Sequence, residues 1–178
     1  IGACAPVRKQ PGKATINSVS VRNQVIGGVG ILLAVWMGLG RWLFGLGGEL
    51  TWWYVPLITV PFALLQLWTV RRIRIAQDGG RRVGRAPYVA LALSWVSALG
   101  FGITVPDVVG GELITIAGHF SGTLANELAI AFCNPLGIVA FATTIIALGY
   151  AAAAGREPRP EEDELDGSGM VPHPFERP

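Results

Sequence analysis

The chain carries little charge. Charged residues make up 15% of its 178 residues and hydrophobic residues 51%, whereas about a quarter of a soluble domain is charged. The hydrophobic residues also stand in long blocks rather than being spread evenly. This composition argues against an ordinary soluble enzyme, a disordered chain or a nucleic-acid-binding domain, and it predicts an integral membrane protein.

The chain also lacks recognisable catalytic and cofactor motifs. It contains no G-x-S-x-G, no H-E-x-x-H, no Walker loop and no Asp-rich pair of the kind that binds prenyl diphosphates. Cys4 and Cys133 define neither a metal motif nor a disulfide framework, so both are predicted to be free. His119 is the only histidine outside the C-terminal tail, and no apolar block contains a haem-ligating histidine. We therefore predict no metal and no cofactor.

Four apolar blocks are long enough to cross a bilayer, since a spanning helix needs about 20 residues. The sequence predicts an all-α integral membrane protein with four transmembrane helices and a long outer connection between the third and the fourth. Trp52 and Trp68 stand near the two ends of the second block, as expected at two membrane interfaces. The predicted spans together form a domain over residues 24–154 and cover about residues 25–48, 50–70, 87–109 and 128–154.

Short glycine-rich and polar segments connect and flank these spans. Only residues 47–49 are available as a turn between the first two spans, which predicts an antiparallel helical hairpin. Residues 110–127 show helical spacing of apolar side chains, which is typical of an amphipathic surface helix, but their glycines fit a short irregular or re-entrant segment equally well. Residues 1–23 form a basic leader. Residues 155–178 form an acidic, proline-rich tail that is predicted to be disordered or extended along a partner.

The segment 71–86 predicts the orientation. It holds a single acid, Asp78, against six arginines: Arg71, Arg72, Arg74, Arg81, Arg82 and Arg85. Short arginine-rich loops stay in the cytoplasm, and four spans then place both termini there. Contact with anionic lipid head groups is compatible with this interpretation, whereas nucleic-acid binding is not predicted. The arginine- and alanine-rich, lysine-poor composition suits a bacterial plasma membrane protein.

Ionisable side chains on the predicted outer side form the candidate site. A charge close to hydrocarbon is costly unless it is paired or hydrated, so Arg41 is expected to pair with Glu49 or Asp107. Such a pair would fix the helix bundle; the alternative is a cation or proton site at an outer mouth. His119 stands seven and eight residues from Glu112 and Glu127, too far along the chain to predict a zinc site. The candidate cluster comprises Arg41, Glu49, Asp107, Glu112, His119 and Glu127.

The centres of the spans contain only neutral polar groups. The absence of aspartate, glutamate and lysine there argues against a secondary transporter acting alone. Instead, we expect hydrogen bonds between helices from Gln66, Ser94, Ser97, Asn134, Thr143 and Thr144. The four-residue spacing of Ser94, Ala98 and Gly102 predicts a seam of small residues for close helix packing.

These observations predict a non-catalytic accessory or structural subunit of a larger bacterial membrane complex, such as a respiratory or transport assembly. Its expected partners are membrane lipids and other membrane subunits. One alternative is a small oligomeric channel or transporter with an acidic outer ring of Asp107, Glu112 and Glu127. Another is an envelope-lipid enzyme that uses His119 and nearby acids.

Overall fold

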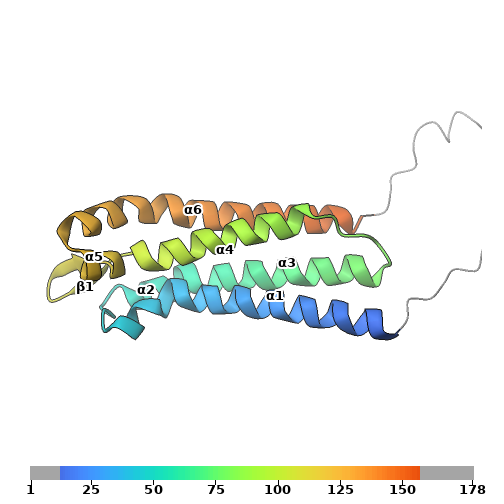
Figure 1. Cartoon of the computed structure of the whole chain (residues 1–178), viewed down its shortest axis with the longest axis horizontal. Helices are drawn as coiled ribbons and strands as arrows, with labels where there is room; N and C mark the ends of the chain where they lie inside the picture. The colour runs from blue at the N-terminus through green and yellow to red at the C-terminus, as the bar shows by residue number, and fades with distance from the viewer. Residues whose placement is uncertain (1–12, 157–178) are drawn as a thin grey trace, which may run out of the picture.

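The computed structural model describes residues 13–156, with side chains from Val21 onward. Its first half is a long helical hairpin (Figure 1). The first arm is helix α1 (Lys13–Leu39), which tightens into the 3₁₀ turn η1 (Gly40–Phe44). The second arm is one helical segment made of α2 (Thr51–Tyr54), the π-helical turn η2 (Val55–Thr59) and α3 (Val60–Asp78). Pro56 and Pro61 are accommodated within this arm, and the π-helical turn lies at Pro56.

The second half contains α4 (Ala86–Thr104) and α6 (Thr123–Ala154), joined by a compact connection. In this connection β1 (Asp107–Val109) pairs antiparallel with β2 (Glu112–Ile114), and the short helix α5 (Ile116–Ser121) follows. Gly110 and Gly111 make the turn between the strands with φ of 62° and 88°, which favours glycine at both positions. Thr115 caps α5, since its Oγ1 accepts a hydrogen bond from the Gly118 amide at 2.9 Å.

Four segments are long and apolar enough to cross a membrane, and the chain is a multi-pass membrane protein. The predicted four-helix architecture is therefore confirmed. The spans lie side by side, and the described ends of α1 and α6 are at the same end of the bundle (Figure 1). The segments are Val21–Phe44, Thr51–Asp78, Ala86–Thr104 and Thr123–Ala154.

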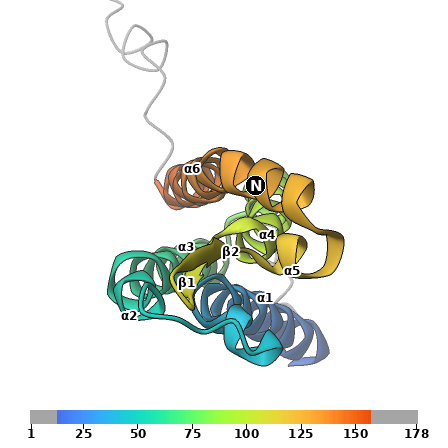
Figure 2. The same ribbon diagram turned by 90° about the vertical axis from the view of Figure 1, so that its left-hand side faces the viewer.

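Packing around the bundle follows the cyclic order α1, α3, α6, α4 (Figure 2). The most extensive contact is between α4 and α6. The predicted small-residue seam is confirmed, because Ser94 and Ala98 of α4 are fully buried and Gly102 is buried. The larger apolar core cluster consists of Leu33, Ala34, Met37, Phe62, Ala98, Phe101, Val105, Cys133 and Ala140, and a second cluster consists of Ile73, Leu91, Ala147 and Ala151. Cys133 is a free cysteine, as expected.

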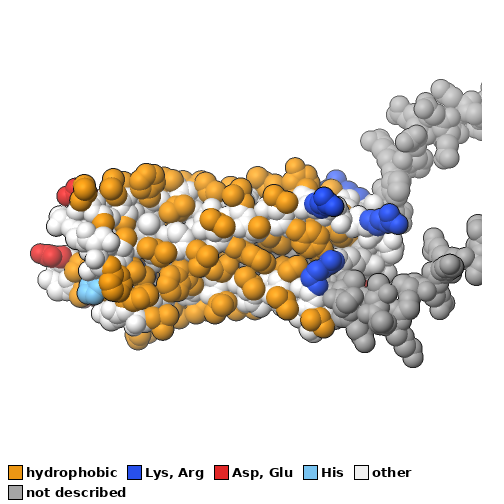
Figure 3. Space-filling model, viewed as in Figure 1, with side chains coloured by type: hydrophobic (Ala, Val, Ile, Leu, Met, Phe, Trp, Pro, Cys, Tyr) orange, Lys and Arg blue, Asp and Glu red, His pale blue; other side chains and the backbone are white. Residues whose placement is uncertain are grey.

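The charged side chains are gathered at the two ends of the bundle (Figure 3). Arginines lie at the end where α3 finishes and α4 begins, which we call the arginine end. Apart from Asp78 at the end of α3, the described acidic side chains and the histidine lie at the other end, around the β1–β2 turn, which we call the hairpin end (Figure 3). Hydrophobic side chains cover the flank between them (Figure 3), as lipid contact requires.

Several helix ends differ from the predicted limits of the spans. α1 begins at Lys13, inside the predicted leader, and the first helical arm ends at Phe44 rather than continuing to residue 48. α3 continues to Asp78, so only residues 79–85 link it to α4. This extension has a physical reason: Arg, Gln and Ala favour helices, and Ile73 and Ala76 are buried at helical spacing.

The other corrections concern the second connection. α4 ends at Thr104 rather than 109, because Pro106 holds the preceding Val105 in an extended conformation. Residues 110–127 match neither prediction, since they contain a β-turn, a strand, α5 and the start of α6. α6 begins at Thr123 instead of 128 and runs through Pro135 without a break. The predictions for residues 1–12 and 157–178 lie outside the described residues.

Candidate functional site

A buried ion pair lies at the hairpin end. Arg41 Nη1 is 3.8 Å from Asp107 Oδ2, and the two side chains are 1% and 0% exposed. Of the two partners expected for Arg41, Asp107 is the one in contact, whereas Glu49 is exposed. Thr51 and Tyr54 complete this group, so we call Arg41, Thr51, Tyr54 and Asp107 the hairpin-end cluster.

Main-chain carbonyls hold the Arg41 guanidinium in place. Its Nη1 donates to the Pro106 carbonyl at 2.7 Å, and its Nη2 donates to the Gly38 carbonyl at 3.2 Å. The guanidinium carbon also lies 4.5 Å from the centroid of the Tyr54 ring, at cation–π distance. The Tyr54 hydroxyl donates to the same Pro106 carbonyl at 3.2 Å. The arginine is thus tied both to its own helix and to the segment after α4.

Three donors surround the Asp107 carboxylate. Thr51 Oγ1 donates to Oδ2 at 2.6 Å, and the amides of Leu50 and Val108 donate to Oδ1 at 3.0 and 2.8 Å. Burial by itself raises the pKa of Asp107, but hydrogen bonds from Thr51 and from main-chain amides, together with the Arg41 charge, outweigh it and leave the pKa below its ordinary value. Asp107 is therefore a carboxylate at neutral pH.

The hairpin-end cluster joins the turn region of the first helical hairpin to a strand more than fifty residues further along the chain. η1 supplies Arg41, α2 supplies Thr51 and Tyr54, and β1 supplies Asp107. Arg41 Nε is the one buried polar side-chain atom of this cluster that has no hydrogen-bond partner among the described residues. Both charges of the pair are engaged with each other and with protein groups, so the arrangement suits fastening the bundle rather than binding a cation.

The remaining outer-side candidates do not join this cluster. Glu49, Glu112, His119 and Glu127 are all exposed. The His119 ring contacts Phe120 edge-on, with 5.2 Å between ring centroids. Over residues 13–156 there is no group of three or more His, Cys, Asp or Glu side chains that could hold a metal ion.

The six predicted arginines do gather at the arginine end. Arg71, Arg72 and Arg74 project from the last turns of α3 and are exposed, as are Arg82 and Arg85 in the link to α4. Arg81 instead donates to the Gly155 carbonyl, which ties this link to the end of α6.

A neutral polar network lies midway along the bundle. Gln66 Nε2 donates to Ser94 Oγ at 3.3 Å and to Thr144 Oγ1 at 3.2 Å, while Trp95 Nε1 donates to Gln66 Oε1 at 3.3 Å. Ser94 Oγ and Thr144 Oγ1 are 2.6 Å apart. We call Gln66, Ser94, Trp95 and Thr144 the mid-bundle network. The interhelical bonding expected for Gln66, Ser94 and Thr144 is confirmed, and it connects α3, α4 and α6.

The other neutral candidates behave differently. Thr143 donates to the Val139 carbonyl of its own helix at 2.7 Å. Asn134 Oδ1 lies 3.8 Å from the Cys133 sulfur, also on the same helix. Ser97 is buried on α4. Tertiary contacts therefore select only some of these polar side chains for the mid-bundle network.

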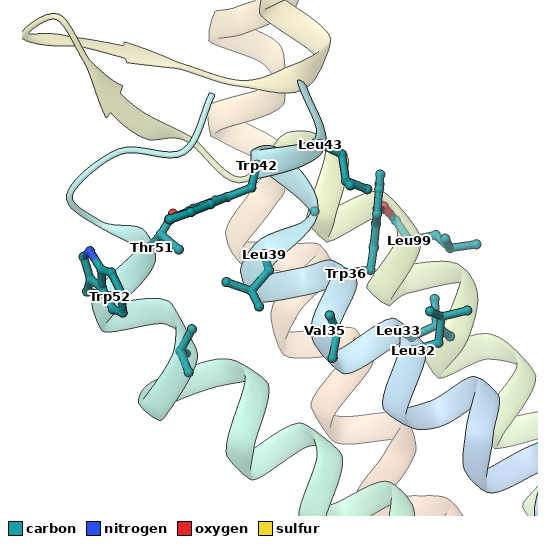
Figure 4. A pocket seen from close by; sticks show the side chains of 12 residues that line it. Leu32, Leu33, Val35, Trp36, Leu39, Trp42, Leu43, Thr51, Trp52 and Leu99 are labelled. Carbon is teal, nitrogen blue, oxygen red and sulfur yellow. Dashed lines mark hydrogen bonds between the residues drawn. The ribbon is translucent and has the colours of Figure 1, made fainter. Parts of the chain in front are cut away.

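An apolar groove opens on the flank of the bundle at the hairpin end (Figure 4). Its volume is about 710 Å³, and α1 runs along it with α2 opposite. The Trp42 and Trp52 rings face each other edge-on across it, with centroids 6.4 Å apart. We call this hollow the α1 groove; it is lined by Leu32, Leu33, Val35, Trp36, Leu39, Gly40, Trp42, Leu43, Thr51, Trp52, Val55 and Leu99.

Sequence reasoning missed the α1 groove and two members of the hairpin-end cluster. Nothing in the local sequence marks Thr51 as the donor to a carboxylate 56 residues away. Trp52 was a usable signal for the groove, but its position in the sequence predicted only a membrane interface. Comparison of the chain with protein-family models, curated proteins and solved structures finds no match.

Proposed function

We propose that the chain is a non-catalytic accessory or structural subunit of a larger membrane complex, and that the α1 groove receives a transmembrane helix of a partner subunit. The observation that carries this proposal is the position of the groove. It opens on the lipid-facing flank and is lined almost wholly by apolar side chains. A cavity for catalysis or transport would instead bring convergent polar groups together.

The shape of the α1 groove favours a helix as its occupant. Lipid tails are as apolar as leucine, so helices associate in a membrane through close packing rather than through hydrophobic burial. Leu32, Val35, Leu39 and Leu43 recur along the groove at spacings of three and four residues and are 37–78% exposed. This spacing presents one continuous ridge to a neighbouring helix.

The interior of the bundle supports a structural role as well. The hairpin-end cluster and the mid-bundle network use buried polar groups to join helices. Asp107 is fully buried and bound to Arg41 and Thr51, so it does not offer an acidic channel mouth. His119 is exposed, and its ring contacts Phe120 rather than a polar group, which does not favour an envelope-lipid enzyme.

Purification from native membranes in mild detergent tests this role. A tagged wild-type chain should bring partner subunits in fixed stoichiometry. Filling the α1 groove with Leu39→Trp should remove them, whereas Ile145→Trp, on the exposed face of α6 and outside the groove, should retain them. A pure homo-oligomer that conducts cations in liposomes would contradict the proposal and favour the channel.

We also propose a bacterial plasma membrane location with the arginine end in the cytoplasm, since arginine-rich loops are retained there. Single cysteines in a background lacking Cys4 and Cys133 test this orientation. Leu113→Cys, at the hairpin end, should react with a membrane-impermeant thiol reagent in intact cells, and Gly84→Cys should not. The opposite labelling pattern would reverse the orientation.

A further inference from the structure

A second groove lies on α3, toward the arginine end, well away from the α1 groove. It has a volume of about 670 Å³ and is lined by Pro61, Leu64, Leu65, Leu67, Trp68 and Arg71. We call it the α3 groove. It differs from the α1 groove in one respect: its apolar wall ends at a cationic side chain.

The residues of the α3 groove share one helical face. Leu64, Leu67, Trp68 and Arg71 occupy positions i, i+3, i+4 and i+7, which lie above one another on a helix. Leu64, Leu67 and Trp68 are 61%, 44% and 52% exposed. The face therefore presents a hydrophobic strip followed by a guanidinium, which matches the order of acyl chain and phosphate in a phospholipid.

The depth of Arg71 in the bilayer also fits this interpretation. Trp52 and Trp68 stand sixteen residues apart on one helical arm, which corresponds to about 24 Å at 1.5 Å per residue. Tryptophans favour the two membrane interfaces, and the hydrocarbon layer is about 30 Å thick. Arg71, one turn beyond Trp68, consequently lies at the level of the lipid phosphates.

The Arg71 guanidinium has no ion pair among the described side chains. The neighbouring Arg72 and Arg74 are exposed on the same helix end. This local excess of positive charge attracts an anionic head group and repels the ammonium of a zwitterionic one. An arginine fork can also bind a phosphate through two parallel hydrogen bonds.

We infer that the α3 groove binds an anionic glycerophospholipid. Its phosphate binds to Arg71, and one acyl chain lies along Leu64, Leu67 and Trp68. This inference is independent of the proposed subunit role. That role uses the α1 groove, which lies at the hairpin end and shares no lining residue with the α3 groove.

Native mass spectrometry of the full-length chain tests the site. The protein is reconstituted in vesicles of equal parts phosphatidylglycerol and phosphatidylcholine with identical acyl chains, then extracted in mild detergent. Wild type should retain phosphatidylglycerol in preference to phosphatidylcholine. Arg71→Ala should lower this retention about fivefold, the size expected for one basic residue at an anionic surface. The matched variant Arg82→Ala removes an exposed arginine outside the groove and should change retention less than about twofold.

A second pair of variants tests the apolar wall without changing charge. Leu67→Trp fills the α3 groove and should lower phosphatidylglycerol retention, whereas Leu93→Trp, on the exposed face of α4, should not. An unchanged melting temperature in detergent shows that each variant is folded. Equal loss in Arg71→Ala and Arg82→Ala, full retention in Leu67→Trp, or equal retention of the two lipids by wild type would each overturn the inference.

Discussion

The hairpin-end cluster and the mid-bundle network both join helices through buried polar groups, but with different chemistry. The cluster contains a carboxylate and a guanidinium, while the network contains only an amide, hydroxyls and an indole. This difference follows membrane depth. Arg41 lies near the end of its span, whereas Gln66 lies midway along its own.

The comparison shows how charged and neutral polar side chains are each stabilised inside the bundle. A charge near hydrocarbon needs several partners, and Asp107 receives three hydrogen bonds besides the Arg41 charge. The neutral groups at the bundle centre are satisfied by hydrogen bonds to one another and to the Ala140 carbonyl. The hairpin-end cluster joins the loop segments at one end of the bundle. The mid-bundle network joins α3, α4 and α6.

The largest expected effect comes from breaking the charged cluster. Asp107→Ala leaves Arg41 buried without its counter-charge, which should lower the free energy of unfolding by about 3–5 kcal/mol. Thermal unfolding in detergent measures this loss. Glu112→Ala, an exposed acid from the neighbouring strand, should stay within about 0.5 kcal/mol of wild type. Similar losses for the two variants would show that the burial of Asp107 does not matter energetically.

Low pH should reduce the stability that the hairpin-end cluster contributes and leave the contribution of the mid-bundle network unchanged. The pKa of Asp107 is lower in the folded chain than its ordinary value of 3.8, so its stabilisation is complete above that pH and is lost as the pH falls through the folded value. The stability difference between wild type and Asp107→Asn should therefore be constant from about pH 7 to pH 5 and shrink below pH 3.8. The corresponding difference for Gln66→Leu should not vary with pH, and a parallel decline would contradict this distinction.

Tight packing of α1 against Gln66 allows a test of the mid-bundle network with a smaller expected effect on stability. A Cβ added at Gly30 would lie 2.9 Å from Gln66 Cβ and 3.0 Å from its Oε1, whereas one added at Gly28 would meet nothing within 4 Å. Gly30→Ala should therefore cost about 1–3 kcal/mol through overpacking. Gly28→Ala should be neutral or stabilising, because alanine is the better helix former. Chemical or thermal unfolding of the two variants compares them directly.

The smallest expected effect separates two adjacent threonines. Thr144 belongs to the mid-bundle network, while Thr143 bonds only to carbonyls of its own helix among the described contacts. Thr144→Val should lower stability by about 0.6 kcal/mol, the average for an interhelical hydrogen bond in a membrane. Thr143→Val should have less effect. Equal losses would assign the effect to the local helix rather than to the network.

Most of the architecture follows from patterns that act locally. The four apolar blocks, the turn after the first of them and the small-residue seam on α4 could all be predicted, because bilayer thickness sets span length and small residues allow close packing. The end of α3 could not be located from charge alone. Its arginines were assigned to a loop because of their polarity, yet their helix propensity and the buried Ile73 and Ala76 continue the helix.

Part of the candidate site could likewise be predicted from the sequence, and part could not. The cost of a charge near hydrocarbon predicted that Arg41 would have a partner, but two acids were equally eligible. Only the folded chain selects Asp107, because β1 places it against η1 while Glu49 stays exposed. Thr51 and Tyr54 were not predictable, since their role depends on contacts across more than fifty residues.

The sequence by itself determined that this chain spans a membrane, how many times it does so, and where its charges lie along the spans. Those properties depend on the transfer of each segment from water to lipid, which is nearly additive along the chain. The tertiary structure decided which polar groups meet and where hollows remain on the surface. Both depend on how helices distant in sequence pack side by side, which local composition does not encode.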